Sequence, residues 1–184
     1  ERLAVGMVFL PRLDLRAQET CRCIVEREIL KMEYNIYGWR QVPVDIKALG
    51  EKANATRPEI EQIMFSMPSS ISEQEAEREL FLIRRRIEKA VLAELINDFY
   101  ICSLSSRSII YKGMFLAEQV TEFYPDLDDK LFISDFAVYH QRYSTNTFPT
   151  WRLAQPFRVL AHNGEINTVR GNMNWMSCHE DRME

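Results

Sequence analysis

The 184-residue chain lacks several features, and each absence excludes a class of protein. No apolar run approaches the roughly 20 residues needed to cross a bilayer, so we expect no membrane span. The balance of 23 Lys and Arg against 27 Asp and Glu gives a net charge of -4. That balance argues against nucleic-acid binding, which normally requires a basic face. Internal repeats, low-complexity tracts and flexible linkers are also missing, so the composition predicts one globular domain.

Cysteine is scarce and has no metal-ligand spacing. Its four positions are Cys21, Cys23, Cys102 and Cys178. Cys21 and Cys23 are two apart in a helical pattern, so we expect them to face different sides. A zinc site usually shows paired ligand spacing at both ends. We therefore expect reduced thiols of a cytoplasmic protein and no metal site.

The sequence has no signal peptide and no initiator Met. It opens with Glu1-Arg2-Leu3, runs directly into an apolar segment, and ends equally abruptly at Met183-Glu184. We therefore expect the 184 residues to be an internal piece of a longer protein. Its expected location is the cytoplasm, or the plastid stroma if the source is a photosynthetic eukaryote.

Strand-like patterns recur along the chain. They lie at residues 4–10, 35–44, 60–67, 99–105, 108–111, 131–145 and 157–162. Gly38 and Pro43 mark a bulge or an edge in the second of them. Residues 45–56 are irregular, with at most one helical turn ending at Gly50.

Three helices are expected between and after these strands. The first begins at the N-cap Asp14 and buries a stripe of Cys21, Val25, Ile29 and Met32. The second has a Ser72/Glu75 capping box and a stripe of Leu80, Ile83, Ile87, Val91 and Leu95. The third is capped by Asn167 or Thr168 and runs through Trp175. Strands and long helices that do not strictly alternate are typical of an α+β fold with a largely antiparallel sheet.

A basic run, Arg84, Arg85 and Arg86, lies on the second helix. We interpret it as a solvated helix face rather than a site for a phosphate or a partner.

Polar chemistry is concentrated in residues 139–176, which hold two of the three histidines and two of the three tryptophans. Asn163-Gly164 follows an apolar strand, where Asn-Gly is a strong tight-turn signal. Alternatively, the Asn163 amide and the Gly164 N–H together form an oxyanion hole.

Arg142 is the second candidate in this stretch. It is followed by Tyr143, Ser144, Thr145, Asn146 and Thr147, and its planar guanidinium suits bidentate capture of a carboxylate. The alternative is a structural salt bridge at a strand end. The stretch contains no convincing nucleophile, because Cys102 lies in an apolar strand and Cys178 in a terminal helix, and both are expected to serve packing. The residues alone therefore indicate a carboxylate clamp and an oxyanion hole without a nucleophile.

Residues 140–176 resemble the glutaminase domain of the glutamate synthase large-subunit family; their sequence is HQRYSTNTFPTWRLAQPFRVLAHNGEINTVRGNMNWM. The same resemblance covers GMVFLP (6–11), GWRQVPV (38–44), RRRIEK (84–89) and FYICSLSSRSIIYKGM (99–114). More broadly, the Arg-Tyr-Ser-Thr and His-Asn-Gly pieces are similar to those of class II, N-terminal-nucleophile glutamine amidotransferases. This implies a four-layer αββα sandwich. Residues 1–184 would be part of one such domain, lacking its N-terminal and C-terminal segments.

The resemblance also implies roles for single residues. Arg142 would bind the α-carboxylate of L-glutamine, with Thr145 and Asn146 lining the same pocket. The Asn163 side chain and the Gly164 N–H would form the oxyanion hole. The family's nucleophile is an N-terminal cysteine, which would lie upstream of Glu1, and the acidic residue for the substrate's amino group would lie downstream of Glu184. We therefore expect the isolated piece to be inactive.

For the intact protein the resemblance implies a glutamate synthase. Glutamine would be hydrolysed to glutamate and ammonia through a cysteinyl thioester. A synthase domain of the same chain would then aminate 2-oxoglutarate, using FMN and a 3Fe-4S cluster. The electron source would be a small NAD(P)H-oxidising flavoprotein subunit or ferredoxin. Two alternatives stay open: an amidotransferase that serves another acceptor, and a non-catalytic glutamine- or glutamate-binding or scaffold module of the same fold.

Overall fold

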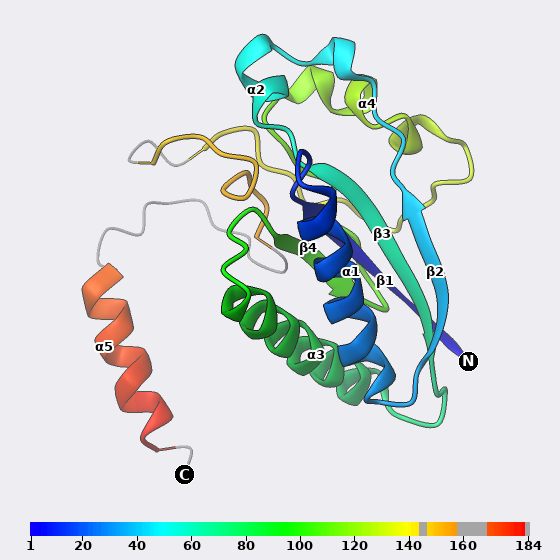
Figure 1. The fold of residues 1–184 in the computed structure, drawn as a ribbon, viewed down its shortest axis with the longest axis vertical. Coiled ribbons are helices and arrows are strands. Elements are labelled where there is room, and N and C mark those ends of the chain that lie inside the picture. The colour runs from blue at the N-terminus through cyan, green and yellow to red at the C-terminus, as the bar shows by residue number, and fades with distance from the viewer. Residues whose placement is uncertain (144–146, 158–168, 183–184) are drawn as a thin grey trace.

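The computed structural model of the chain describes residues 1–143, 147–157 and 169–182 (Figure 1). Its centre is a four-stranded sheet in the order β2-β3-β1-β4, in which every neighbouring pair is antiparallel. The strands are β1 (Arg2–Leu10), β2 (Asn35–Gln41), β3 (Glu59–Met67) and β4 (Tyr100–Ser105). With the helices described below, this confirms the predicted α+β class and its antiparallel sheet.

The central strand β1 is buried on both faces because its apolar run has no polar side to turn outward. Ala4, Val8 and Leu10 belong to one core cluster, whereas Met7 and Phe9 belong to the other. Gly6 is required at the middle of β1. A Cβ there would lie 2.7 Å from Ile63 Cγ2 and 2.9 Å from Leu104 Cδ1 on the flanking strands.

Two long helices, α1 (Leu15–Leu30) and α3 (Glu73–Ala93), lie side by side across one face of the sheet (Figure 1). The N-cap prediction for α1 is confirmed, because Asp14 Oδ1 accepts from the Ala17 N–H at 2.9 Å. The capping box of α3 is also confirmed by reciprocal bonds between Ser72 and Glu75. These bonds lower the pKa of the Glu75 carboxyl.

The apolar stripes of both helices face the sheet. Cys21, Val25 and Ile29 are buried, and Met32 packs against the same core just after α1 ends. On α3 the buried residues include Leu80, Ile83, Ile87 and Val91. The predicted stripe is wrong at Leu95. This residue lies beyond the end of α3 with a φ of 59°, and it is 83% exposed.

Short elements cover the opposite face of the sheet. They are η1 (Ile46–Ala48), α2 (Glu51–Ala55), η2 (Ala117–Gln119), α4 (Val120–Phe123) and η3 (Pro125–Asp128). Beneath them lies a second core that includes Met7, Phe9, Cys102, Phe123, Tyr124 and Trp151. In the described ranges this face carries helical turns and loops rather than a second sheet. The remaining layers of the αββα sandwich therefore stay a prediction.

Two boundaries in the first half of the chain differ from expectation. β2 ends at Gln41, before Pro43, which has no N–H for a ladder. The bulge predicted at Gly38 is confirmed by a register shift and a φ of 137°. The predicted helical turn is η1 (Ile46–Ala48), but it ends at Leu49, and Gly50 stands at the N-cap of a further helix, α2.

Residues 108–111 do not form the predicted strand. The Ile110 N–H donates to Ser103 Oγ at 3.1 Å, and the Ser108 N–H donates to Ser105 Oγ at 3.2 Å. Serine hydroxyls of β4 thus take the place of ladder carbonyls. The alternating side chains of this segment predict a strand, but hydrogen bonds from its N–H groups to serine hydroxyls set its backbone conformation instead.

The strand predicted at 131–145 is also wrong for residues 131–143. This segment is irregular throughout, and Leu131, Ile133, Phe136 and Tyr139 are exposed. A strand requires a neighbour to satisfy its backbone groups, and the described part of the chain places no strand beside it.

The last predicted elements lie partly outside the described residues. That applies to residues 158–162 of the final strand and to the helix caps Asn167 and Thr168. The helix itself is α5 (Val169–Glu180), which continues five residues past the predicted end at Trp175.

The prediction of a solvated basic face on α3 holds for Arg85 and Arg86, which are exposed. It is wrong for Arg84, which is 8% exposed. Its Nη1 lies 2.7 Å from Glu88 Oε1, and its Cζ lies 5.0 Å from the centre of the Phe81 ring. The i, i+4 spacing to Glu88 explains how this cation is accommodated.

Candidate functional site

Arg142 is the one predicted site residue that the structure describes. It lies exposed in the irregular segment before residue 144, and its N–H donates to His140 Nδ1 at 3.1 Å. Within the described ranges its guanidinium makes no ion pair. The alternative of a structural salt bridge at a strand end thus receives no support there. Thr145, Asn146, Asn163 and Gly164 lie outside the described residues, so their relation to Arg142 stays a prediction.

Tyr143 fixes the backbone immediately after Arg142. Its hydroxyl donates to the Thr150 carbonyl at 2.9 Å and lies 3.4 Å from the Gly113 carbonyl. Burial raises the pKa of this phenol to about 12, so it stays a protonated donor at neutral pH. The residue next to the proposed clamp is therefore tied to two separate parts of the chain.

Trp151 ties the same loop to the far end of the sheet. Its indole is 4% exposed, and Nε1 donates to the Ala53 carbonyl on α2 at 3.0 Å. Its ring packs edge-on against Phe9 of β1 at a centroid distance of 6.0 Å. An indole buried with its N–H satisfied is a strong anchor, because it combines large apolar burial with a directional bond.

Lys112 reaches the loop from the opposite side. The side chain is only 2% exposed, and Nζ donates to the Arg152 carbonyl at 2.9 Å. The same ammonium lies 4.5 Å from the centre of the Tyr100 ring and 4.9 Å from that of Phe157. Aromatic faces attract a desolvated cation, so the two rings stabilise the buried charge.

Gly113 makes room for this arrangement. A Cβ there would lie 2.4 Å from Phe115 Cε1 and 2.6 Å from Trp151 Cζ3. We call Lys112, Gly113, Tyr143 and Trp151 the loop anchor. Nothing in the local sequence pattern singles out Lys112 or Gly113. The one signal that could have revealed the pair is its place in the FYICSLSSRSIIYKGM motif.

An ion pair holds the segment that carries Lys112 against the sheet. Arg40 of β2 meets Asp126 through two bonds, of 2.6 and 2.8 Å, and the Tyr111 hydroxyl donates to Asp126 at 2.9 Å. Hydrogen bonding from Arg40 lowers the pKa of the Asp126 carboxyl. Burial, followed by the bond to Asp126, raises the pKa of Tyr111 to about 12. We call Arg40, Tyr111 and Asp126 the clasp.

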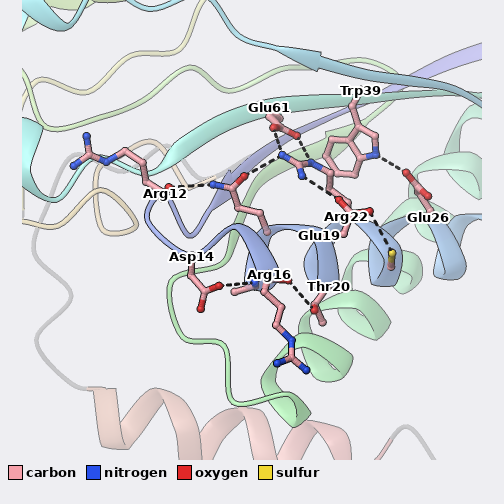
Figure 2. A network of polar contacts seen from close by, with 12 residues as sticks. Arg12, Asp14, Arg16, Glu19, Thr20, Arg22, Glu26, Trp39 and Glu61 are labelled. Atoms are coloured by element: carbon pink, nitrogen blue, oxygen red, sulfur yellow. Dashed lines mark hydrogen bonds and ion pairs between the residues drawn. The ribbon is translucent and has the colours of Figure 1, made fainter.

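A second polar network connects α1 to the sheet (Figure 2). Arg22 binds Glu61 of β3 through Nε at 2.9 Å and Nη2 at 2.5 Å. Nearby, the Trp39 indole donates to Glu26 at 2.7 Å. The bond to Glu61 raises the pKa of Arg22. These contacts register the helix on the strands and lie on the face opposite to the loop anchor.

The cysteines occupy four different environments. Cys21 is buried and Cys23 is exposed, which confirms that they face different sides of α1. Burial raises the pKa of the Cys21 thiol to about 11. Cys102 is buried in β4 as predicted, whereas Cys178 is exposed on α5, so the packing role expected for it is wrong.

Two further properties concern metals and membranes. The described residues bring no three His, Cys, Asp or Glu side chains together in an arrangement suited to a metal ion. Within the same ranges no helix is long and apolar enough to span a membrane.

All 184 residues match the model of the family described as glutamine amidotransferases class-II, and the chain belongs to that family. The mixed fold with its antiparallel sheet agrees with this class. The family resemblance drawn from the sequence motifs is thereby confirmed.

Within the family the chain is similar to glutamate synthases. It is 72% identical over 183 residues to the glutamate synthase [NADPH] large chain of Azospirillum brasilense. It is 47% identical over 184 residues to ferredoxin-dependent glutamate synthase 2 of Synechocystis sp.. It is also 46% identical over 177 residues to ferredoxin-dependent glutamate synthase 1 of Arabidopsis thaliana. These matches cover 96–100% of this chain but only 11–12% of the relatives' length.

Proposed function

We propose that residues 1–184 are part of the glutaminase domain of a glutamate synthase. The full-length protein hydrolyses L-glutamine to glutamate and ammonia, and its synthase domain uses the ammonia to aminate 2-oxoglutarate to a second glutamate. The observation that carries this proposal is the 72% identity, over the whole chain, to a glutamate synthase large chain.

In this proposal Arg142 holds the α-carboxylate of glutamine. Its exposed guanidinium, without an ion pair in the described part of the chain, is available for a bidentate ligand. The adjacent Tyr143 limits its position through the bond to the Thr150 carbonyl. Thr145 and Asn146 follow within three or four residues and line the same pocket.

The reaction begins with a thiolate that, as in the family, belongs to an N-terminal cysteine outside these residues. Its sulfur bonds to the side-chain amide carbon, and the carbonyl electrons move onto oxygen. The Asn163 amide and the Gly164 N–H stabilise that oxyanion, and losing one such donor typically costs about 3–4 kcal/mol of barrier. Collapse breaks the carbon–nitrogen bond, the nitrogen takes a proton and leaves as ammonia, and water hydrolyses the thioester.

FMN and a 3Fe-4S cluster would serve the synthase part of the full-length protein. The described residues do not fit an iron–sulfur cluster, because Cys21 and Cys102 are buried in separate cores while Cys23 and Cys178 are exposed on different helices. We therefore assign both groups to the rest of the polypeptide.

The electron source in this proposal is a small NADPH-oxidising flavoprotein subunit. The 72% identity to a large chain named for NADPH supports this choice, and ferredoxin is the alternative, because relatives of both kinds are 42–47% identical. The proposed location is the cytoplasm. The names of several plant relatives specify the chloroplast, which keeps the plastid stroma as the alternative for a photosynthetic source.

The test follows the amide nitrogen in the full-length protein. With amide-labelled glutamine, 2-oxoglutarate and NADPH, we expect the label in the α-amino group of glutamate newly made from 2-oxoglutarate. Label released as ammonia but absent from glutamate would indicate another acceptor. Glutamine that binds and is not consumed would indicate a non-catalytic module, and either result would contradict the proposal.

A further inference from the structure

Three buried polar atoms without partners lie in one corner of the protein. Among the described residues, the buried side-chain atoms that lack a hydrogen bond are Arg12 Nε, Asn54 Oδ1 and Arg57 Nε. Arg12 follows β1, and the other two lie between the last turn of α2 and the start of β3. Buried polar atoms are normally paired, so three exceptions in neighbouring segments indicate a missing partner.

The two guanidinium groups reach the same short turn. Arg12 Nη2 donates to the Ala55 carbonyl at 3.4 Å, and Arg57 Nη1 donates to the Pro58 carbonyl at 3.4 Å. The Arg12 side chain points away from the Arg22–Glu61 pair that joins α1 to β3, while its own carbonyl accepts from Gln18 (Figure 2). Each guanidinium therefore makes a single long bond, and its buried Nε has no acceptor among the described residues.

No carboxylate of the described residues lies within 4.0 Å of either group. Arg22 and Arg40, by contrast, each meet a carboxylate through two nitrogens. Burial, followed by the positive charge of Arg12, lowers the pKa of Arg57. The Glu59 carboxylate offsets only part of this effect, so the two like charges of this partly buried corner still repel each other.

We propose that Arg12 and Arg57 form an oxyanion site that a carboxylate or phosphate group completes. The planar forks of two guanidinium groups match the oxygens of such a group. The Asn54 amide can turn its NH₂ group toward the same ligand. A bound anion replaces the repulsion between Arg12 and Arg57 with a net attraction, because it attracts both guanidinium groups.

The site is connected to the loop that carries Arg142. Ala53, next to Asn54, supplies the carbonyl that accepts from the Trp151 indole. An occupied site therefore stabilises α2 and, through it, the loop anchor. This inference does not depend on the proposed function, and its test uses no activity.

The site is tested in the full-length protein by removing each positive charge and measuring whether stability falls or rises. With an anion bound, Arg12→Gln and Arg57→Gln each lower the midpoint of thermal unfolding, by about 2–4 °C for a domain of this size. The double variant loses less than the sum, because both residues bind one group. The control is Arg2→Gln, since Arg2 also makes one long carbonyl bond, 3.3 Å to Ser72, but has no orphaned Nε.

If no anion binds, Arg12→Gln relieves repulsion, so an unchanged or raised midpoint would overturn the proposal. Hydrogen exchange of residues 50–58 is the second readout, because it reports the corner locally even if another part of the protein unfolds first. We expect faster exchange in both single variants and no change in Arg2→Gln.

Inorganic phosphate distinguishes the two sources of the anion. If the ligand is a free oxyanion, phosphate raises the midpoint of the wild type above that in chloride of matched ionic strength. Arg57→Gln then loses this increase. If a carboxylate of the protein itself fills the site, phosphate has no effect on the wild type, yet both single variants are still destabilised.

Discussion

At the scale of single residues, the candidate site depends in part on side chains that lie far from Arg142 in the sequence. Arg142 could be selected from its polar neighbours alone, because arginine followed by hydroxyl and amide residues suits carboxylate binding. The loop anchor could not be found that way. Lys112 bonds to a carbonyl 40 residues later in the chain, and no local pattern encodes that distance.

Lys112→Met removes the ammonium and keeps an apolar stem of similar length. The Arg152 carbonyl then loses its donor, which costs about 1–3 kcal/mol in the free energy of unfolding. Because the loop that carries Arg142 is loosened while the reacting groups stay, the KM for glutamine should rise more than kcat falls. Steady-state kinetics and denaturant unfolding measure both effects. Lys47→Met, at an exposed lysine of η1, is the control, and an unchanged KM in Lys112→Met would count against the anchor.

Gly113→Ala places a methyl group against two aromatic rings, at 2.4 Å from Phe115 and 2.6 Å from Trp151. Overpacking of this kind costs about 1–3 kcal/mol, so the free energy of unfolding should fall by that amount. Gly50→Ala provides the comparison, because a Cβ there meets open space and only a weak N-cap preference of about 1 kcal/mol is at stake. Equal stability of the two variants would show that the rings yield.

At the scale of elements, local signals predicted helices better than strands. The caps Asp14 and Ser72 fix the starts of α1 and α3 through bonds to residues three positions away. Strands depend on partners that local sequence does not name. In residues 108–111, backbone N–H groups bond to serine hydroxyls rather than to a neighbouring strand. Residues 131–143 have no neighbouring strand in the described part of the protein.

The clasp makes the attachment of residues 111–128 sensitive to acid. Arg40 lowers the pKa of Asp126, so the charged pair adds stability above the ordinary aspartate pKa of about 3.9. That contribution is lost as the pH falls through the lowered pKa of the folded state. We expect Asp126→Asn to be destabilised at neutral pH and to lose less further stability than the wild type on acidification.

Unfolding curves recorded between about pH 6 and pH 3 measure this difference. Asp128→Asn is the matched control, because Asp128 is exposed two residues along and makes no ion pair in the described ranges. Parallel pH profiles of the wild type and Asp126→Asn would show that the clasp does not carry the acid sensitivity.

At the scale of the whole molecule, the sheet has two different faces. One is packed by α1 and α3 and registered by the Arg22–Glu61 pair. The other supports the loop anchor and the segment that leads to Arg142. The sequence does not predict which face of the sheet supports the site, because apolar side chains of β1 contribute to the cores on both faces.

Residues 1–184 expressed alone should not hydrolyse glutamine. In the proposed function the nucleophile is an N-terminal cysteine, and none of the four cysteines of these residues occupies that place. Ammonia release from glutamine, measured beside the full-length protein at equal molar concentration, tests this. Turnover by the isolated chain at a comparable rate would mean that the nucleophile has been misassigned.

The central claim, that this chain holds the glutamine pocket of a glutamate synthase, rests most directly on Arg142. In the full-length protein we expect Arg142→Ala to raise the KM for glutamine about 10- to 100-fold, the loss of a charge-assisted carboxylate contact. Glutamate synthesis from added ammonia should be unchanged, because it bypasses the glutaminase site. Arg152→Ala is the control, since that exposed side chain lies in the same loop and only its carbonyl is used. An Arg142→Ala enzyme with an unaltered KM for glutamine would contradict the claim.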